Sequence, residues 1–343
     1  MQLGKVLVAA AVVLACAPAA AARAATPTVV AVGDSAISGE AGRWAGNTNG
    51  DPSRTDALGP TAYYDNAANT AETIPGCHRS KSAEVLIGGG VTGVNLACSG
   101  ARTTTTGTGS GDDFKPGIDF YSDASGRKGQ ALMLREEAAR RNVKAVVVMI
   151  GANNYGFGAI VERCVTNWAT SPSWWKNYCS DDSDMTSRFT ATRQQQETTA
   201  VRDAFLRVRD AMSGAGYSSS QYTIIAQTYW TPIPRASGFR YGETGWTRQS
   251  VGGCGIWNRD ADWAHTTVVP AMNGSVRNGA AAFTVVRFIT VTTVSLAQSA
   301  SRFHVPHPPI DWRSQPDSGY RKPEPRGIGD QYVWARIVYC DAE

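Results

Sequence analysis

Short apolar runs, each closed by a glycine or a polar residue, recur along the chain. The first is Thr28–Gly33 (TVVAVG), which is rich in β-branched residues. Similar runs follow at Val91–Ala97, Val143–Ile150, Tyr222–Thr228 and Phe283–Val294. The runs are continuous rather than alternating, which is typical of strands in a parallel sheet that is covered on both faces. The pattern therefore predicts buried strands of a parallel sheet.

Segments with helical spacing lie between these runs. In Gln194–Met212, apolar residues recur every three or four positions, and Gly214 and Gly216 then supply a stop signal. Lys128–Arg141 also has a helical pattern, and a third helix is expected around Asp260–Ala282. The alternation of strands and helices predicts a doubly wound α/β sandwich, in which ligand sites lie beyond the carboxyl ends of the strands.

The N-terminus has the layout of a secretory signal peptide. Residues 1–25 contain Lys5, an apolar run from Val6 to Ala15, and a stretch of small residues that ends at Ala24. The apolar run is too short to span a bilayer, so no integral membrane span is expected. We predict a secreted protein whose mature chain, residues 26–343, is a single domain with loop insertions. The alternative is a lipoprotein signal, in which Cys16 anchors the protein to the cell surface.

Composition and charge exclude several classes of protein. Of 343 residues, 33 are Lys or Arg and 29 are Asp or Glu, and the resulting charge of +4 is spread without basic runs. This distribution argues against a nucleic-acid partner. The chain has neither a C-x-x-C nor an H-E-x-x-H motif, so no metal site is expected.

The cysteines fit an exported protein. The full chain has seven cysteines, and removal of the signal peptide with Cys16 leaves an even number, which can form three disulfides in an oxidising compartment. The number of possible pairings leaves the connectivity open. Pairing of sequence neighbours is our prediction, namely Cys77 with Cys98, Cys164 with Cys179, and Cys254 with Cys340.

Candidate chemistry follows three of the predicted strands. The first ends in Gly33-Asp34-Ser35, where the serine is either a hydroxyl at the rim of the sheet or part of an ordinary helix cap. Gly100 follows the second predicted strand, where either its backbone N–H donates to a ligand or its φ is positive because it forms a turn. Asn153, after the third, either donates to a developing oxyanion or is a turn residue. Together they supply the nucleophile and donors that acyl transfer requires.

These segments resemble the SGNH (GDSL-type) hydrolase family, and exported actinobacterial-type GDSL esterases and lipases in particular. The shared motifs are GDS-x-x-SGE, NLACSGA and IGANN, and the resemblance extends from about Thr28 to Asn273. It implies a three-layer α/β/α sandwich with a mainly parallel, flavodoxin-like sheet. It also implies that Ser35 is the nucleophile, that Ser35, Gly100 and Asn153 form the oxyanion hole, and that no cofactor or metal is needed. Asn154 stands where the general motif has Asp.

The general base is less well defined. The family has a D-x-x-H-P motif near the C-terminus, and the chain contains four histidines, His78, His265, His304 and His307. The D-x-x-H that ends at His265 lies in a predicted helix and lacks the proline, so we interpret it as a coincidence on a helix surface. His78 is expected to be a solvated loop residue. We predict His304 as the base, with His307 next, although neither has an acid three residues before it.

The predicted function is that of a secreted serine esterase or lipase that acts as a monomer on a small-molecule or lipid ester. One alternative is a carbohydrate O-deacetylase of the same fold. The second is a non-catalytic extracellular binding protein that lost its base, since the segment from about 295 to 330 is atypical of the family. Tryptophans that could form a carbohydrate platform, or pack in the core and insertions, are Trp168, Trp174, Trp175, Trp230 and Trp246.

Overall fold

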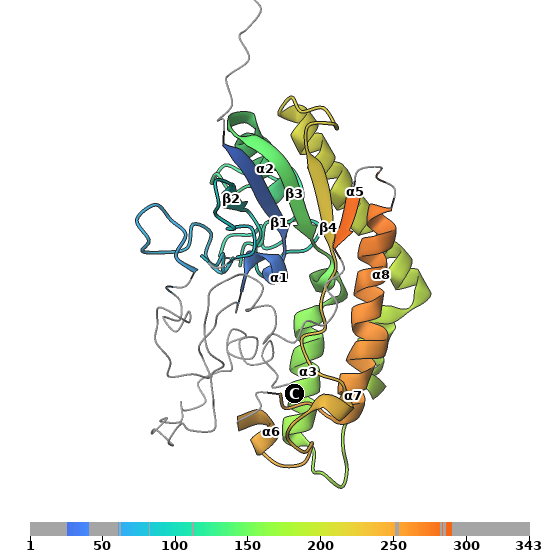
Figure 1. Ribbon diagram of the computed structural model, residues 1–343. Coiled ribbons are helices and arrows are strands. Elements are labelled where there is room, and N and C mark those ends of the chain that lie inside the picture. Colours follow the sequence, from blue (N-terminus) through green and yellow to red (C-terminus); the bar gives the residue numbers. More distant parts are fainter. Residues whose placement is uncertain are drawn as a thin grey trace, which may run out of the picture.

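A five-stranded parallel sheet forms the centre of the fold (Figure 1). The computed structural model describes residues 26–40, 61, 63–81, 83–111, 113–250, 254–281, 283 and 286–289. The strand order β2-β1-β3-β4-β5 is that of flavodoxin-like folds, so the predicted α/β fold class is confirmed. The strands are β1 (Pro27–Gly33), β2 (Thr92–Asn95), β3 (Asn142–Met149), β4 (Thr223–Gln227) and β5 (Val286–Ile289).

Three long helices form a layer on one face of this sheet. Helix α5 (Ala191–Gly214) packs against both α2 (Gln130–Arg140) and α8 (Val269–Ala280). Right-handed crossovers place the helices that follow β2, β3 and β4 on the same face. All three lie within or close to the segments predicted as helical, and α5 ends at Gly214, as its stop signal predicts. The face against this layer is buried, as the registered residues Val146 and Ile224 show.

The predicted third helix is divided into parts. It consists of α7 (Asn258–Trp263), a π-helical turn (Ala264–Val268) and α8, which follow one another without a break. Helix α3 (Phe157–Thr170) was not predicted, and it lies with α6 (Thr247–Ser250) and α7 beyond the carboxyl ends of the strands (Figure 1). The remaining short helices are α1 (Ser35–Ser38), α4 (Ser183–Thr186) and the 3₁₀ turns Ala152–Tyr155, Cys179–Asp181, Ser187–Phe189 and Ala236–Gly238.

The second face of the sheet is less buried than the continuous apolar runs predict. Val147 and Ile225 are paired in register and point away from the layer of long helices, and both are half-buried. In a parallel sheet, residues paired in register point to the same side. Buried and half-buried residues therefore alternate in the same way on neighbouring strands, and one face of the sheet is more buried than the other. The described residues thus place the three long helices on one face, while the one-turn helix α1 lies at the carboxyl end of β1 and contacts β1 and β3 (Figure 1).

Two predicted disulfides are confirmed. Cys77 is bonded to Cys98 and Cys164 to Cys179. Cys254 is also disulfide-bonded, and its predicted partner Cys340 lies outside the described residues. The Cys164 and Cys179 sulfurs lie near the Asp260 carboxylate, but sulfurs joined in a disulfide are not available as thiolate ligands.

Several predictions concern parts of the chain that the structure does not describe. These are the signal peptide with Cys16, the atypical segment from about 295 to 330, and the two histidines His304 and His307. Among the described residues, no helix has both the length and the apolar character needed to cross a membrane.

Candidate active site

A glycine that no other residue could replace connects β1 to the candidate nucleophile. Gly33 has a φ of +150°, and a Cβ atom placed on it would lie 2.0 Å from the carbonyl oxygen of Met149. This close approach allows the next N–H, that of Asp34, to donate to the same oxygen at 3.0 Å. The buried side chain of Gln130 accepts from the N–H of Gly33 at 2.7 Å and donates to its carbonyl at 2.8 Å. Hydrogen bonds to β3 and to Gln130 of α2 therefore fix the turn before Ser35.

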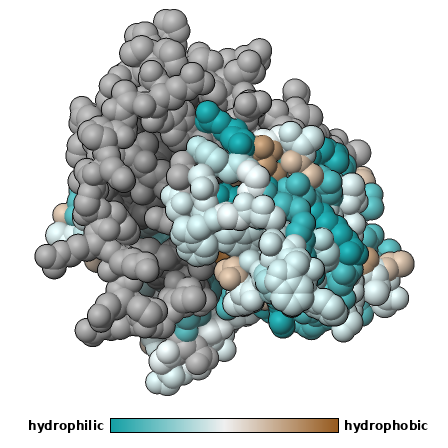
Figure 2. Space-filling view, turned by 90° about the horizontal axis from the view of Figure 1, so that it is seen from below, coloured by the Kyte–Doolittle hydropathy of each residue, from teal (hydrophilic) through white to brown (hydrophobic). Residues whose placement is uncertain are grey.

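Ser35 is the first residue of α1 and is half-buried. The helix cap is provided by Asp34, whose Oδ1 accepts from the N–H of Ala36 at 3.1 Å, so the cap interpretation applies to Asp34 rather than Ser35. Ser35 lines a pocket at the carboxyl end of the sheet, together with Asn153 and Glu40. Figure 2 views the molecule from this end, where small hydrophobic patches interrupt a mainly hydrophilic described surface.

The structure brings two of the three predicted oxyanion residues into one pocket. Asn153 lies in the 3₁₀ turn after β3, and its Nδ2 donates to the carbonyl of Ala101 at 3.0 Å. An amide nitrogen carries two hydrogens, and this bond uses one of them while fixing the plane of the side chain. Gly100 is not among the residues that line the pocket. It has a φ of +78° beside the stem of Lys115, as the turn interpretation requires.

Asn154, the departure from the family motif, is explained by its neighbours. Its Nδ2 donates to Glu197 at 2.8 Å and to the hydroxyl of Thr103 at 2.9 Å, while its Oδ1 accepts from the N–H of Thr103 at 3.1 Å. An aspartate at this position would place a second carboxylate against Glu197 without a donor between them. Asn154 is thus a structural link between the turn after β3, helix α5 and the loop after β2.

A buried tyrosine, which the sequence did not single out, joins the ends of three strands. The hydroxyl of Tyr229, which follows β4, donates to Asp34 and accepts from the N–H of Ala152 at 3.1 Å. Asn273 holds the backbone of Tyr229 by accepting from its N–H at 2.7 Å and donating to its carbonyl at 2.9 Å. Because Asp34 precedes Ser35 and Ala152 precedes Asn153, this one hydroxyl links the turns that carry both candidate groups.

Burial raises the pKa of Asp34 to about 7, although the hydrogen bonds from Tyr229 and from the N–H of Ala36 lower it. Compared with the ordinary value of 3.8, the folded protein binds a proton more tightly at this carboxyl. The stability that protonated Asp34 contributes is therefore complete below 3.8 and is lost as the pH rises through about 7.

Replacement of Tyr229 by phenylalanine should destabilise the protein more at alkaline than at acidic pH. The ionised form of Asp34 loses its hydroxyl donor, and the N–H of Ala152 loses its acceptor. We expect a loss of about 1–3 kcal/mol above the pKa of Asp34 and a smaller loss at about pH 5. Urea unfolding at both pH values measures this, with Tyr222→Phe, another buried tyrosine, as the control. Equal losses at the two pH values would contradict the proposed role of this bond.

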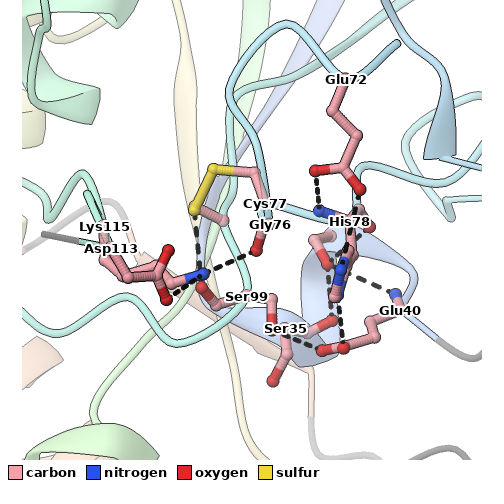
Figure 3. A network of polar contacts seen from close by, with 11 residues as sticks. Ser35, Glu40, Glu72, Gly76, Cys77, His78, Ser99, Asp113 and Lys115 are labelled. Carbon is pink, nitrogen blue, oxygen red and sulfur yellow. Dashed lines mark hydrogen bonds and ion pairs between the residues drawn. A yellow bond between two sulfur atoms is a disulfide. The ribbon is translucent and has the colours of Figure 1, made fainter. Parts of the chain in front are cut away.

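His78 is not the solvated loop residue that was expected. Its side chain is 15% exposed and stacks on Tyr63, with ring centroids 4.7 Å apart. Its Nδ1 lies 2.6 Å from one oxygen of Glu40, and its Nε2 lies 3.7 Å from Glu72 (Figure 3). The other oxygen of Glu40 accepts from the hydroxyl of Ser99 at 2.6 Å. The sequence did not indicate this network because Glu40 and Ser99 lie 38 and 21 positions from His78, although Glu72 is only six positions away.

The surroundings of His78 favour its charged form. Burial lowers the pKa of His78, but the hydrogen bond that its ring donates to Glu40 and the charges of Glu40 and Glu72 outweigh burial, so the pKa is raised. Both ring nitrogens of His78 lie near a carboxylate, which makes it a poor candidate for the base that accepts the serine proton. Because Glu40 also lines the Ser35 pocket, the network supports the wall of this pocket.

His265 and Asp262 hold a backbone segment rather than forming a catalytic pair. His265 lies on the π-helical turn, and its Nε2 donates to the carbonyl of Ile233 at 2.8 Å. Asp262 accepts from the N–H of Ala236 at 2.9 Å. The interpretation of this motif as a surface coincidence is therefore incomplete, because both side chains fix the segment from 233 to 236. His304 and His307 lie outside the described residues.

Comparison with known proteins finds similarity to solved structures only. No protein-family model and no curated protein matches the chain. The structure is similar in fold to an extracellular lipase from Streptomyces rimosus. The two are 16% identical in sequence, the match covers 78% of this chain and 80% of the lipase, and the TM-score is 0.41.

Proposed function

We propose that the protein is a serine-dependent carboxylic ester hydrolase, an esterase or lipase. The observation that carries the proposal is the position of Ser35, half-buried at the carboxyl end of β1 and in one pocket with Asn153. In the proposed reaction, the hydroxyl of Ser35 attacks the ester carbonyl, and the acyl group forms an ester with the serine. The amide of Asn153 and the N–H of Ser35 stabilise the oxyanion. The family resemblance adds Gly100 as a third donor, although Gly100 does not line the pocket. No cofactor or metal takes part.

The proposed base is His304, with His307 as the next candidate. The two histidines in the described part of the chain fit the role poorly, because His78 pairs with two carboxylates and His265 donates to a backbone carbonyl. The base takes the proton of Ser35, returns it to the leaving alcohol, and then activates the water that hydrolyses the acyl-enzyme. With no acid before either histidine, a backbone carbonyl would orient the ring.

The proposed setting is extracellular, with the protein acting as a secreted monomer on an ester substrate. Its disulfides support this proposal, because such bonds form and persist mainly in oxidising compartments. The signal peptide and the possible lipid anchor at Cys16 remain predictions from the sequence.

A carbohydrate O-deacetylase is the second candidate, and exposed tryptophans favour it. Trp174 is 82%, Trp175 72% and Trp246 63% exposed, and such aromatic faces can stack on sugar rings. Trp246 stacks on the buried Trp168 with centroids 5.7 Å apart, so packing explains part of this cluster. Trp230 lines the pocket of Ser35 itself. Acetylated xylan, compared with tributyrin as substrate, separates the two activities.

Labelling with a fluorophosphonate probe tests the proposed function. This reagent reacts with serines that are activated as nucleophiles, so peptide mass spectrometry should find the label on Ser35 and not on the neighbouring Ser99. Heat-unfolded protein is the control and should remain unlabelled. A folded protein without label on Ser35 would contradict the hydrolase proposal and favour the non-catalytic binding protein.

A further inference from the structure

An apolar pocket lies beside the pocket of Ser35. One wall is a single face of α3, whose lining residues are spaced at three, four, seven and eight positions from the first, as on one side of an α-helix. These residues are Phe157, Ile160, Val161, Cys164 and Val165. In a closely packed core, such a stripe would be covered fully by a neighbouring helix. Here it faces a cavity.

The opposite wall comes from the π-helical turn and its surroundings. Ala264 and Val268 lie at the two ends of this turn, and Ile233 contributes from the loop after β4. The hydrogen bond from His265 to the carbonyl of Ile233 holds this loop against the turn. π-helical turns are rare and often occur at functional sites, where they displace side chains from the regular helical positions.

The two pockets share part of their walls. Phe157, Pro232 and Val269 line both of them, so the apolar pocket continues from the site of Ser35. The carboxylate of Asp260 is the one charged group in its lining, and its two oxygens accept from the N–H groups of Cys179 at 3.2 Å and Ser180 at 3.0 Å. The pocket therefore offers mainly hydrocarbon contacts to a ligand, and the oxygens of its carboxylate already accept hydrogen bonds from the backbone.

We propose that this pocket receives the acyl chain of an ester bound at Ser35, and that the preferred substrates are esters of medium-chain fatty acids. The inference rests on the proposed function. From Phe157 to Val165, the wall extends about 12 Å along α3, much longer than an acetyl group. An apolar chain gains free energy in such a pocket, whereas a sugar would lose its hydrogen bonds to water. The acyl group also remains on the serine after the alcohol has left, so a pocket that adjoins the serine suits it better than the alcohol.

A chain-length series with two blocking variants tests the proposal. For the wild type, kcat/KM should rise from p-nitrophenyl acetate through butyrate to octanoate, by up to about fourfold for each buried methylene. Val161→Phe, one turn from the shared wall, should reduce the ratio of octanoate to acetate activity more than tenfold. It should also reduce the ratio of butyrate to acetate activity. Val165→Phe, one turn further, should reduce the ratio of octanoate to acetate activity but leave the ratio of butyrate to acetate activity unchanged. The matched control is Thr166→Phe, an exposed position beside Val165, which should leave both ratios unchanged.

Two results would overturn the proposal. One is a wild-type enzyme that hydrolyses all acyl lengths equally. The other is a series of acetate esters with longer alcohols that shows the length preference instead, because the pocket would then hold the alcohol. If either phenylalanine variant fails to fold by circular dichroism, Ala264→Leu provides a smaller obstruction from the opposite wall.

A binding measurement separates this inference from the proposed function. Ser35→Ala protein should bind decanoate by calorimetry, and addition of Val161→Phe should remove the binding. Label on Ser35 without decanoate binding or chain preference would leave the hydrolase proposal standing and refute the acyl pocket. Decanoate binding that Val161→Phe removes, in a protein whose Ser35 is not labelled, would refute the hydrolase and identify a fatty-acid site.

Discussion

Replacement of Ser35 by alanine is expected to lower kcat for ester hydrolysis by about a million-fold, because the chain then lacks its nucleophile. The fold should be unaffected, since the hydrogen bonds that Ser35 makes in α1 use its backbone carbonyl. This oxygen accepts from the hydroxyl of Ser38 at 2.9 Å and from the N–H of Glu40 at 3.3 Å. Initial rates with p-nitrophenyl butyrate, together with thermal unfolding, measure both effects.

The control for Ser35→Ala is Ser125→Ala, which changes an exposed serine between β2 and α2. It should retain wild-type activity and stability. Ser35→Ala protein that keeps more than about one per cent of the wild-type kcat would contradict the assignment, since removal of a nucleophile costs several orders of magnitude. In that case, the hydroxyl of Ser99 beside Glu40 would be the next candidate.

Replacement of Asn153 by alanine should lower kcat by about 10²–10³-fold, the usual effect of removing one oxyanion donor. KM should change little, because the donor acts on charge that develops in the transition state. The bond from Asn153 to the carbonyl of Ala101 is also lost, so a moderate loss of stability is expected. Steady-state kinetics with p-nitrophenyl butyrate measure the division between kcat and KM.

The neighbouring asparagine is the matched control. Asn154→Ala removes the donor to Glu197 and the acceptor of the Thr103 N–H, so it should cost about 1–3 kcal/mol of stability. Its effect on kcat at a temperature where the variant is folded should be much smaller than that of Asn153→Ala. The opposite result, a catalytic Asn154 and a structural Asn153, would reverse the two roles.

Most of the fold could be predicted because it depends on local patterns. Continuous apolar runs predicted the strands, and spacing of three to four residues predicted α2 and α5. Helix α3 was missed although Phe157–Thr170 has the same spacing. The prediction assumed one helix between successive strands, and α5 already filled that position between β3 and β4. Helix α3 is an additional helix that lies beyond the sheet, with its apolar face toward a pocket.

The candidate site could be predicted only in part. Ser35 and Asn153 follow directly from strand ends, because the carboxyl ends of parallel strands meet at one edge of the sheet. The roles of Tyr229 and Glu40 could not, since each depends on partners that are distant in sequence. Tyr229 bonds to Asp34, 195 positions away, and Glu40 bonds to His78, 38 positions away.

The sequence by itself determined the fold class and indicated which strand ends carry the candidate residues, whereas the pairing of neighbouring cysteines was one choice among many that the structure confirmed for two disulfides. These features depend on residue type and on distance along the chain. Only the tertiary structure decided that Asp34 is buried against Tyr229, that His78 is paired with two carboxylates, and that an apolar pocket adjoins Ser35. Burial and hydrogen bonding between distant segments determine pKa values and cavities, and the folded chain alone specifies which segments meet.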